Sequence, residues 1–278
     1  MTLPLPQRPC PCPDSPNPHL SCCFLFLQPV QVTEPALAPS PGRVWASGLG
    51  NCLSPGLSLP GCTPRKCGRG VTDTVITREE AERIRSIAEK GLSLGGSDGG
   101  ASILDLHSGA LSVGKHFVNL YRYFGDKIQN IFSEEDFQLY REVRRKVQLT
   151  IAEAFGISAA SLHLTKPTFF SRINSTEART AHDEYWHAHV DKVTYGSFDY
   201  TSLLYLSDYL EDFGGGRFVF MEEGANKTVE PRAGRVSFFT SGSENLHRVE
   251  KVRWGTRYAI TIAFSCNPDH GIQDPAFP

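Results

Sequence analysis

Apolar positions in the segment after residue 71 recur with the period of a helix. Thr77 followed by Glu80 is a capping-box signature, which marks the start of a helix. Gly91 is suited to end it. The apolar stripe between them consists of Ala81, Ile84, Ile87 and Ala88. The pattern predicts an amphipathic helix that closes at Gly91, followed by a flexible glycine-rich loop at residues 95–100, which lacks the Lys-Ser/Thr of a phosphate-binding loop.

A second helix is predicted from Ser133, with Asp136 three residues later, to Gly156. A basic run lies largely off its apolar stripe and is interpreted as its solvated face. The stripe consists of Phe137, Tyr140, Val143, Val147, Ile151 and Ala154, and the basic run of Arg141, Arg144, Arg145 and Lys146.

Beyond residue 160 the pattern changes to that of short strands separated by turn residues. The β-rich segments are 162–173, 186–195, 201–207, 217–221, 235–240, 246–252 and 257–265. Strands without intervening helices favour a closed or two-layer β core. We therefore expect an α+β protein with a jelly-roll core, against one outer face of which the earlier helices pack.

The last of these segments has two unlike faces, because alternate residues of a strand point to opposite sides. One face carries Tyr258, Ile260, Ile262 and Phe264, and the other Arg257, Ala259, Thr261 and Ala263. The large apolar face should pack under the helices. The small face leaves room for a ligand, and a buried Arg257 requires an anionic partner.

The amino-acid composition changes near residue 70, which indicates a domain boundary there. The first 70 residues hold most of the prolines and seven of the eight cysteines, with few charges. This predicts a disordered Pro/Cys-rich leader at 1–70. The domain should span 71–278, with helical support at 71–160 and the β-helix core at 161–266. Because only Cys266 lies within that domain, it is not expected to be a disulfide scaffold.

The formal net charge of −2 gives no indication of nucleic-acid binding, and no nucleic acid is expected as a partner. No stretch approaches the roughly 20 apolar residues that a membrane-spanning helix needs.

The segment His189-Val190-Asp191 carries the clearest candidate chemistry. In a strand its histidine and aspartate would share a face, and His247 from a later segment could complete the set. Two histidines and one carboxylate can hold a ferrous ion and leave other positions open. A zinc site built on His187 and His189 is the alternative, but it leaves Asp191 without a role.

Four stretches of the chain resemble the 2-oxoglutarate and Fe(II)-dependent oxygenases, in their prolyl 4-hydroxylase-like branch. The stretches occur in the order and at the approximate spacing of that family, whose core is a double-stranded β-helix. They are His189-Val190-Asp191, Leu203-Leu204-Tyr205-Leu206-Ser207-Asp208, Gly215-Gly216-Arg217-Phe218-Val219-Phe220, and the segment from His247 to Gly255-Thr256-Arg257.

The resemblance implies that His189, Asp191 and His247 bind iron. It implies that Arg257 pairs with the distal carboxylate of 2-oxoglutarate and that Tyr205 hydrogen-bonds the same group. Collagen-type members commonly have lysine where Arg257 stands, and arginine offers the same charge with a bidentate fork.

The activity implied is that of a dioxygenase, which uses O2, converts 2-oxoglutarate to succinate and hydroxylates a peptidyl side chain of a protein or peptide. L-Ascorbate is the expected auxiliary reductant. The alternative is a catalytically silent β-helix domain that acts as a binding module.

Two sequons, Asn174-Ser175-Thr176 and Asn226-Lys227-Thr228, are candidates for N-glycosylation. The resemblance implies a location at a membrane of the endoplasmic reticulum or secretory pathway. The chain itself shows no transmembrane segment, so its location stays open at this point.

Overall fold

The computed structural model describes residues 44–46 and 61–275. Most of the predicted leader therefore lies outside the described residues. Strand β2 (Gly68–Thr72) extends across the proposed boundary at residue 70 and pairs with β12 (Val236–Thr240). The segment just before the predicted domain is thus part of its large sheet.

Helix α1 (Arg78–Leu92) begins as predicted, since Thr77 and Glu80 form a capping box. The prediction that Gly91 ends it is wrong. Gly91 lies inside the helix, and a Cβ atom there would come within 2.3 Å of Leu104 Cδ2. Gly91 is therefore required by packing against the sheet rather than by the geometry of a helix end.

Helix α3 (Glu134–Phe155) also begins and ends as predicted, capped by Ser133 and closed by Gly156 at φ 64°. One member of the predicted solvated face is an exception. Arg144 is buried, with its guanidinium 4.6 Å from the centre of the Tyr140 ring and in an ion pair with Asp274. Two shorter turns complete the α-helices, α2 (Leu120–Phe124) and α4 (Asp191–Tyr195).

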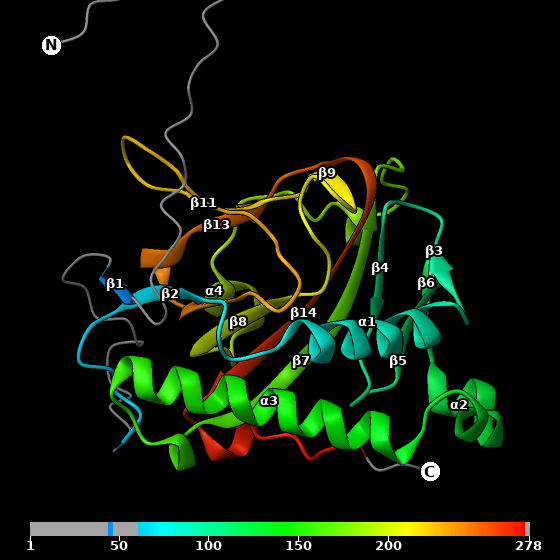
Figure 1. Cartoon of the computed structure of the whole chain (residues 1–278), viewed down its shortest axis with the longest axis horizontal. Helices are drawn as coiled ribbons and strands as arrows, with labels where there is room; N and C mark the ends of the chain where they lie inside the picture. Colours follow the sequence, from blue (N-terminus) through cyan, green and yellow to red (C-terminus); the bar gives the residue numbers. More distant parts are fainter. Residues whose placement is uncertain (1–43, 47–60, 276–278) are drawn as a thin grey trace, which may run out of the picture. The chain divides into compact units, whose positions relative to one another are not determined.

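The strands form two sheets (Figure 1). The large sheet has the order β1-β2-β12-β8-β14-β7-β4-β5-β3, with β6 beside β5 and β9 beside β14, and the small sheet has the order β11-β10-β13. This arrangement is the predicted jelly-roll core. The remaining strands are β1 (Val44–Ala46), β3 (Gly96–Ser97), β4 (Ala101–Leu104), β5 (Ala110–Gly114), β6 (His116–Asn119), β7 (His163–Asn174), β8 (Tyr200–Tyr205), β9 (Phe213–Gly215), β10 (Phe218–Phe220), β11 (Lys227–Val229), β13 (His247–Val249) and β14 (Val252–Ser265). Five 3-10 turns occur among the same residues: η1 (Gly125–Asn130), η2 (Ala159–Ser161), η3 (Ala181–Asp183), η4 (Ser243–Asn245) and η5 (Pro268–His270).

The segment 71–160 is not purely helical, because β3 to β6 lie within it and extend the large sheet beyond β7. These strands have two to five residues, too few to show a clear alternation of apolar and polar positions. The glycine-rich run predicted as a flexible loop includes β3. A Cβ on Gly100 would approach Thr176 O to 2.4 Å, so part of the run packs closely.

The strand predicted at residues 186–195 is also wrong. His189 forms only an isolated bridge with His247, and the chain then turns into α4 at Asp191. The β-branched residues that suggested a strand include Val193, which is 82% exposed and faces no partner strand. Tertiary contacts have overridden local propensity here.

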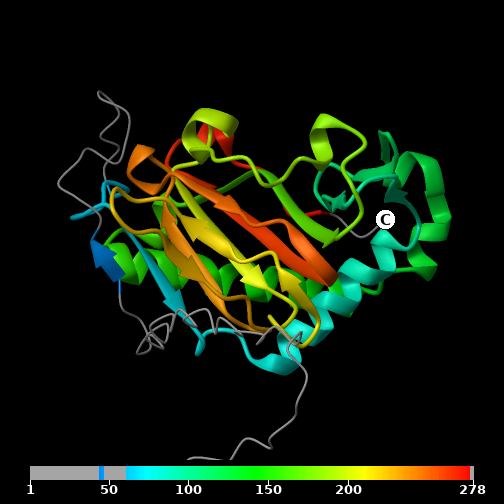
Figure 2. The same cartoon turned by 90° about the horizontal axis from the view of Figure 1, so that it is seen from above.

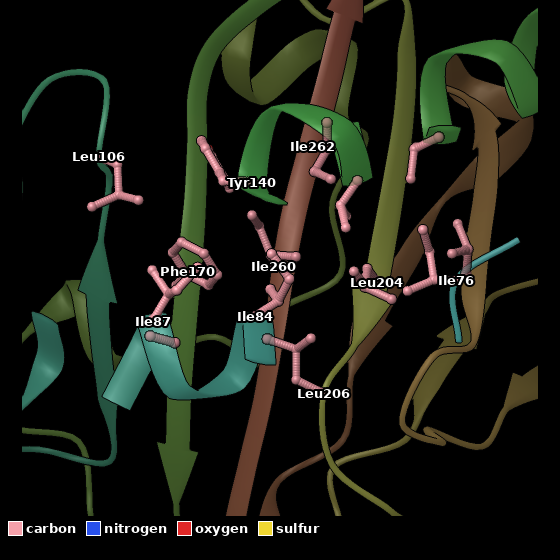
Figure 3. Packing of buried hydrophobic residues seen from close by; sticks show 14 of the residues in the cluster. Ile76, Ile84, Ile87, Leu106, Tyr140, Phe170, Leu204, Leu206, Ile260 and Ile262 are labelled. Atoms are coloured by element: carbon pink, nitrogen blue, oxygen red, sulfur yellow. The ribbon is translucent and has the colours of Figure 1, made fainter. Parts of the chain in front are cut away.

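The two faces of β14 are confirmed. Its apolar face packs under α1 and α3, and Ile260 lies near Ile84 of α1 (Figure 3). Helix α3 crosses the large sheet on the same side (Figure 2). On the opposite face Ala259 joins a separate cluster with side chains of the small sheet, including Phe218. Each fully buried aliphatic side chain contributes about 1.5–3 kcal/mol, so this layer is a main source of stability.

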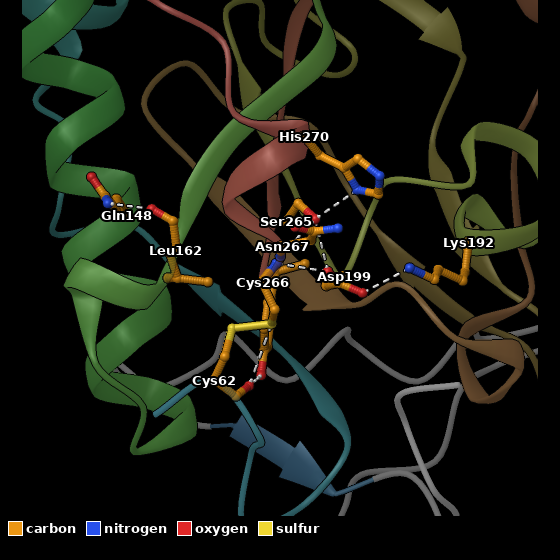
Figure 4. The surroundings of a disulfide bond; sticks show 10 residues. Cys62, Gln148, Leu162, Lys192, Asp199, Ser265, Cys266, Asn267 and His270 are labelled. Carbon is orange, nitrogen blue, oxygen red and sulfur yellow. Dashed lines mark hydrogen bonds and ion pairs between the residues drawn. A yellow bond between two sulfur atoms is a disulfide. The ribbon is translucent and has the colours of Figure 1, made fainter. Parts of the chain in front are cut away.

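A disulfide joins Cys62 to Cys266, across 204 residues of sequence (Figure 4). It links the segment before β2 to the residue after β14, a pairing that the sequence did not predict. Within the described ranges, no helix has both the length and the apolar character needed to cross a membrane.

Candidate metal centre and cosubstrate pocket

His189, Asp191 and His247 converge on one point, although the strand argument used to relate the first two was wrong. One ligand atom from each lies within 4.8 Å of the others. Asp191 Oδ1 is 3.4 Å from His189 Nε2 and 3.5 Å from His247 Nε2. Two reciprocal backbone hydrogen bonds between His189 and His247, of 2.9 and 3.1 Å, hold the two histidines side by side.

The outward nitrogen of each imidazole has a fixed partner. His189 Nδ1 lies 3.0 Å from the carbonyl oxygen of His187, and His247 Nδ1 lies 2.8 Å from that of Asn245. Because a carbonyl only accepts, each Nδ1 carries the proton and donates. The Nε2 atoms of both rings then face Asp191, and they are the atoms that can bind a metal once they carry no proton.

The Asp191 carboxylate is buried but stays charged. Burial alone would raise its pKa, yet hydrogen bonds involving His189, His247 and Thr201 hold the pKa well below its usual range. Thr201 Oγ1 donates to Asp191 Oδ2 over 2.6 Å and lies 2.8 Å from Ser241 Oγ. The negative charge is therefore available to offset a cation.

Aromatic rings enclose His247. Phe218 stacks on it at 4.9 Å between ring centres, and Phe239 meets it at 5.0 Å. Phe220 is 6.3 Å away. These rings are buried and apolar, so this side of the triad is dry, whereas the His189 side chain is 31% exposed and marks the open side.

Arg257 lies on the inner face of β14, as predicted, and only 1% of it is exposed. Its Nε donates to Gly216 O over 2.9 Å, while Nη2 has no hydrogen-bond partner among the residues that the structure describes. Burial lowers the pKa of Arg257, and the nearby Tyr205 and Tyr185 act in the opposite direction. An unsatisfied buried guanidinium group is costly, which indicates an anionic ligand at this position.

Tyr205 flanks the arginine, with its ring centre 5.6 Å from the Arg257 guanidinium carbon. Its hydroxyl lies 2.9 Å from Ser237 Oγ, and both residues are fully buried. Ser237 and Thr201 were not among the site residues predicted from the sequence. Thr201 could have been found, because it shares a face of β8 with Tyr205 by strict alternation.

The other histidines of this segment lie apart from the triad. His187 pairs with Glu184 at 2.7 Å and is 65% exposed, and His182 meets the ring of Phe117 edge-on. Among the described residues, only the His189–Asp191–His247 group brings three potential ligands together, so the zinc alternative based on His187 has no support.

Comparisons with known proteins show the family to which the chain belongs. A sequence profile described as the 2OG-Fe(II) oxygenase superfamily matches residues 174–265. The chain is 96% identical over 218 residues to the human 2-oxoglutarate and iron-dependent oxygenase domain-containing protein 3, covering 78% of this chain and 68% of that protein. The chain therefore belongs to the 2-oxoglutarate and Fe(II)-dependent oxygenase superfamily, as an enzyme of the 2-oxoglutarate-dependent oxygenase class.

A more distant relative is prolyl 3-hydroxylase 2 of Mus musculus. The chain is 41% identical to it over 73 residues, which is 25% of this chain and 10% of the relative. This similarity agrees with the predicted prolyl hydroxylase-like branch. A solved prolyl hydroxylase from Trichoplax adhaerens, in complex with a hypoxia inducible factor peptide fragment, aligns with a TM-score of 0.46 at 14% identity, covering 71% of this chain and 83% of that one.

Proposed function

We propose that this chain is an Fe(II)- and 2-oxoglutarate-dependent dioxygenase in which His189, Asp191 and His247 hold the iron. We further propose that Arg257 binds the distal carboxylate of 2-oxoglutarate. The observation that carries the proposal is the convergence of three ligand atoms within 4.8 Å on the same inner surface as a buried Arg257, whose Nη2 has no hydrogen-bond partner among the described residues.

The residues present fit a ferrous ion. Two neutral imidazoles and one carboxylate form the donor set that leaves further coordination positions open in non-haem iron oxygenases. Bound iron would supply the redox chemistry that joins O2, the conversion of 2-oxoglutarate to succinate and CO2, and hydroxylation of a C–H bond. The chain supplies the fixed Nε2 atoms, the charged Asp191 and the dry aromatic wall.

The residues present also fit a dicarboxylate. Arg257 offers a fixed fork of donors, which suits a carboxylate and keeps its charge even when buried. A Cβ on Gly216 would lie 3.2 Å from Arg257 Cδ, so a glycine at this position leaves the space that the arginine side chain occupies. Tyr205, oriented by Ser237, is proposed to donate its hydroxyl hydrogen to the same carboxylate.

The proposed substrate is a peptidyl side chain, a proposal that rests on the local similarity to a prolyl hydroxylase. The side with the exposed edge of His189 is where the substrate would approach. L-Ascorbate is proposed as the reductant that keeps the iron ferrous between turnovers.

The test is succinate formation by the purified protein with Fe(II), 2-oxoglutarate and ascorbate, in the absence of any substrate. We expect slow turnover. His189→Ala should abolish it, because this variant lacks one of the three proposed iron ligands. His187→Ala is the matched control, since this histidine is exposed and pairs with Glu184. Absence of both turnover and iron binding in the unmodified protein would sink the enzyme proposal and leave a binding module.

We also propose that the domain resides in the secretory pathway. The Cys62–Cys266 disulfide is of a kind that persists in oxidising compartments.

Of the two sequons, Asn226 lies exposed between β10 and β11, whereas Asn174 is part-buried at the end of β7 and accepts a hydrogen bond from Thr176 N. After expression in mammalian cells, a glycosidase-sensitive band that Asn226→Gln removes is expected, and a protein insensitive to the glycosidase would contradict the location.

A further inference from the structure

We propose that Asp199 is a positioning residue for the metal ligand Asp191, and that it acts through Lys192. The proposal rests on the proposed function, because it assumes that Asp191 binds the metal. It assigns a role to a buried carboxylate that lies outside the triad and outside the cosubstrate pocket.

Asp191 is the first residue of α4, a helix too short to be stable on its own. Helix α4 has five residues, and a helix this short is marginal in water without tertiary contacts. Asp191 is its only buried residue, and Val193 is 82% exposed. The position of the ligand must therefore be set by the residues that anchor α4.

Two anchors act on Lys192, the residue next to the ligand. Its backbone N–H donates to Ser241 O over 2.9 Å, and its ammonium group lies 2.8 Å from Asp199 Oδ1. The lysine side chain is 28% exposed and the Asp199 side chain 10%, so the pair is largely shielded from solvent. Shielding strengthens an ion pair relative to one on the open surface.

Asp199 is in turn fixed to the end of the large sheet (Figure 4). Its Oδ2 accepts from Ser265 Oγ over 3.0 Å and from the backbone N–H of Cys266 over 2.7 Å. Cys266 is covalently joined to Cys62. The carboxylate thus connects a covalently closed strand end on one side to the ligand-bearing turn on the other.

The backbone of Asp199 reaches the same ligand by a second route. Its carbonyl accepts from Ser241 N over 3.0 Å. Ser241 Oγ contacts Thr201, whose hydroxyl donates to Asp191 Oδ2. Both oxygens and the backbone of Asp199 therefore act on the residues that set where the Asp191 carboxylate lies relative to the two histidines.

Metal sites tolerate ligand displacements of only about 0.2 Å, so loosening α4 should weaken binding without removing a ligand. Loss of a group that orients a ligand typically weakens metal affinity by about 10-fold to 100-fold. We expect a loss of about 10-fold for Asp199→Asn and for Lys192→Met, and we expect Lys192→Arg to restore most of the affinity because it keeps the charge.

The experiment titrates each purified variant with Co(II), an air-stable stand-in for Fe(II), and follows visible absorption. Lys146→Met is the matched control, since Lys146 forms a comparable part-buried ion pair with Glu80, between α3 and the start of α1. The control should bind Co(II) as the unmodified protein does. Thermal unfolding is recorded for each variant without metal.

The outcomes separate the two proposals. An unmodified protein that does not bind Co(II) overturns the proposed function and this inference with it. Variants of Asp199 and Lys192 that bind as tightly as Lys146→Met overturn the positioning role alone, even if they unfold at lower temperature. If Asp199→Asn does not fold, the Lys192→Met variant decides, because the lysine side chain is more exposed than Asp199.

Discussion

At the scale of single residues, the site is defined by two unbalanced charges on one inner surface. Asp191 keeps a negative charge next to two histidine side chains, and Arg257 has a buried donor with no hydrogen-bond partner among the described residues. Such an arrangement suits a cation at one end and a carboxylate at the other. The two ends can be tested separately because different residues form them.

Replacing Arg257 by alanine should weaken 2-oxoglutarate binding by about 10-fold to 100-fold, since a hydrogen bond to a charged group contributes about 1.5–3 kcal/mol. Co(II) binding should be nearly unchanged, because Arg257 is not one of the three converging ligands. Calorimetric titration of the Co(II)-loaded protein with 2-oxoglutarate measures the first effect. Equal loss of both affinities would count against the assigned role, and Arg217→Ala, which removes an ion pair with Glu250, is the control.

The sequence was sufficient for the residues that touch the proposed ligands but not for those that orient them. His189, Asp191 and His247 were found because their spacing matches a known pattern. Asn245, whose carbonyl fixes the His247 ring, carries no local signal, because its role depends on a backbone position reached only after folding. Asp199 was missed for the same reason, since its partners are set by the pairing of β14 and β8.

At the scale of elements, helix α1 shows how packing can reverse a local preference. Alanine is normally better than glycine within a helix by about 1 kcal/mol. At position 91, however, the added methyl group would meet Leu104 Cδ2 at 2.3 Å and Phe132 Cζ at 3.0 Å. Both neighbours are buried, so they have little room to move.

Gly91→Ala should therefore lower the free energy of unfolding, by about 1–3 kcal/mol for overpacking less the helix gain of about 1 kcal/mol. Urea unfolding followed by circular dichroism measures the change. Ser86→Ala, at an exposed position of the same helix, should be neutral or slightly stabilising. A stabilised Gly91→Ala variant would show that the helix moves easily over the sheet.

The long elements were predictable and the short ones were not. Helices α1 and α3 carry capping boxes and full apolar stripes, and these signals are local. Strands β3 to β6 have too few residues for a pattern, and they exist because β7 offers β4 a partner some 70 residues later in the chain. The segment 186–195 has strand-like composition, but it forms a single isolated bridge, between His189 and His247, before α4 begins, so local propensity alone was misleading.

At the scale of the whole molecule, the Cys62–Cys266 bond joins two segments at opposite ends of the described chain. A covalent link over so long a loop restricts the unfolded chain far more than the folded one. In the loop-entropy account a loop of about 100 residues or more corresponds to roughly 4–5 kcal/mol, and removal of native disulfides typically costs about 2–5 kcal/mol.

The double variant Cys62→Ala with Cys266→Ala should lose about 2–5 kcal/mol of unfolding free energy. Guanidinium unfolding under non-reducing conditions measures this loss. A reductant should then destabilise the unmodified protein more than the variant. A variant as stable as the unmodified protein would mean that the link contributes little beyond the contacts around it.

The order of strands in the large sheet follows from pairings that no local pattern encodes. Strand β14 lies between β7 and β8, although it is the last of the described strands in the chain. The sequence could indicate that β14 has one face for the helices and one for a ligand. It could not indicate which strands would be its neighbours.

This late central strand has a consequence for protein synthesis. As the chain leaves the ribosome, β7 and β8 emerge well before β14, and each then presents an unpaired edge where β14 will lie. Exposed strand edges invite pairing with other chains. The nascent protein is thus most vulnerable to aggregation in the interval before β14 is translated. When β14 pairs with β7 and β8, it covers both edges and also places Arg257 in the site.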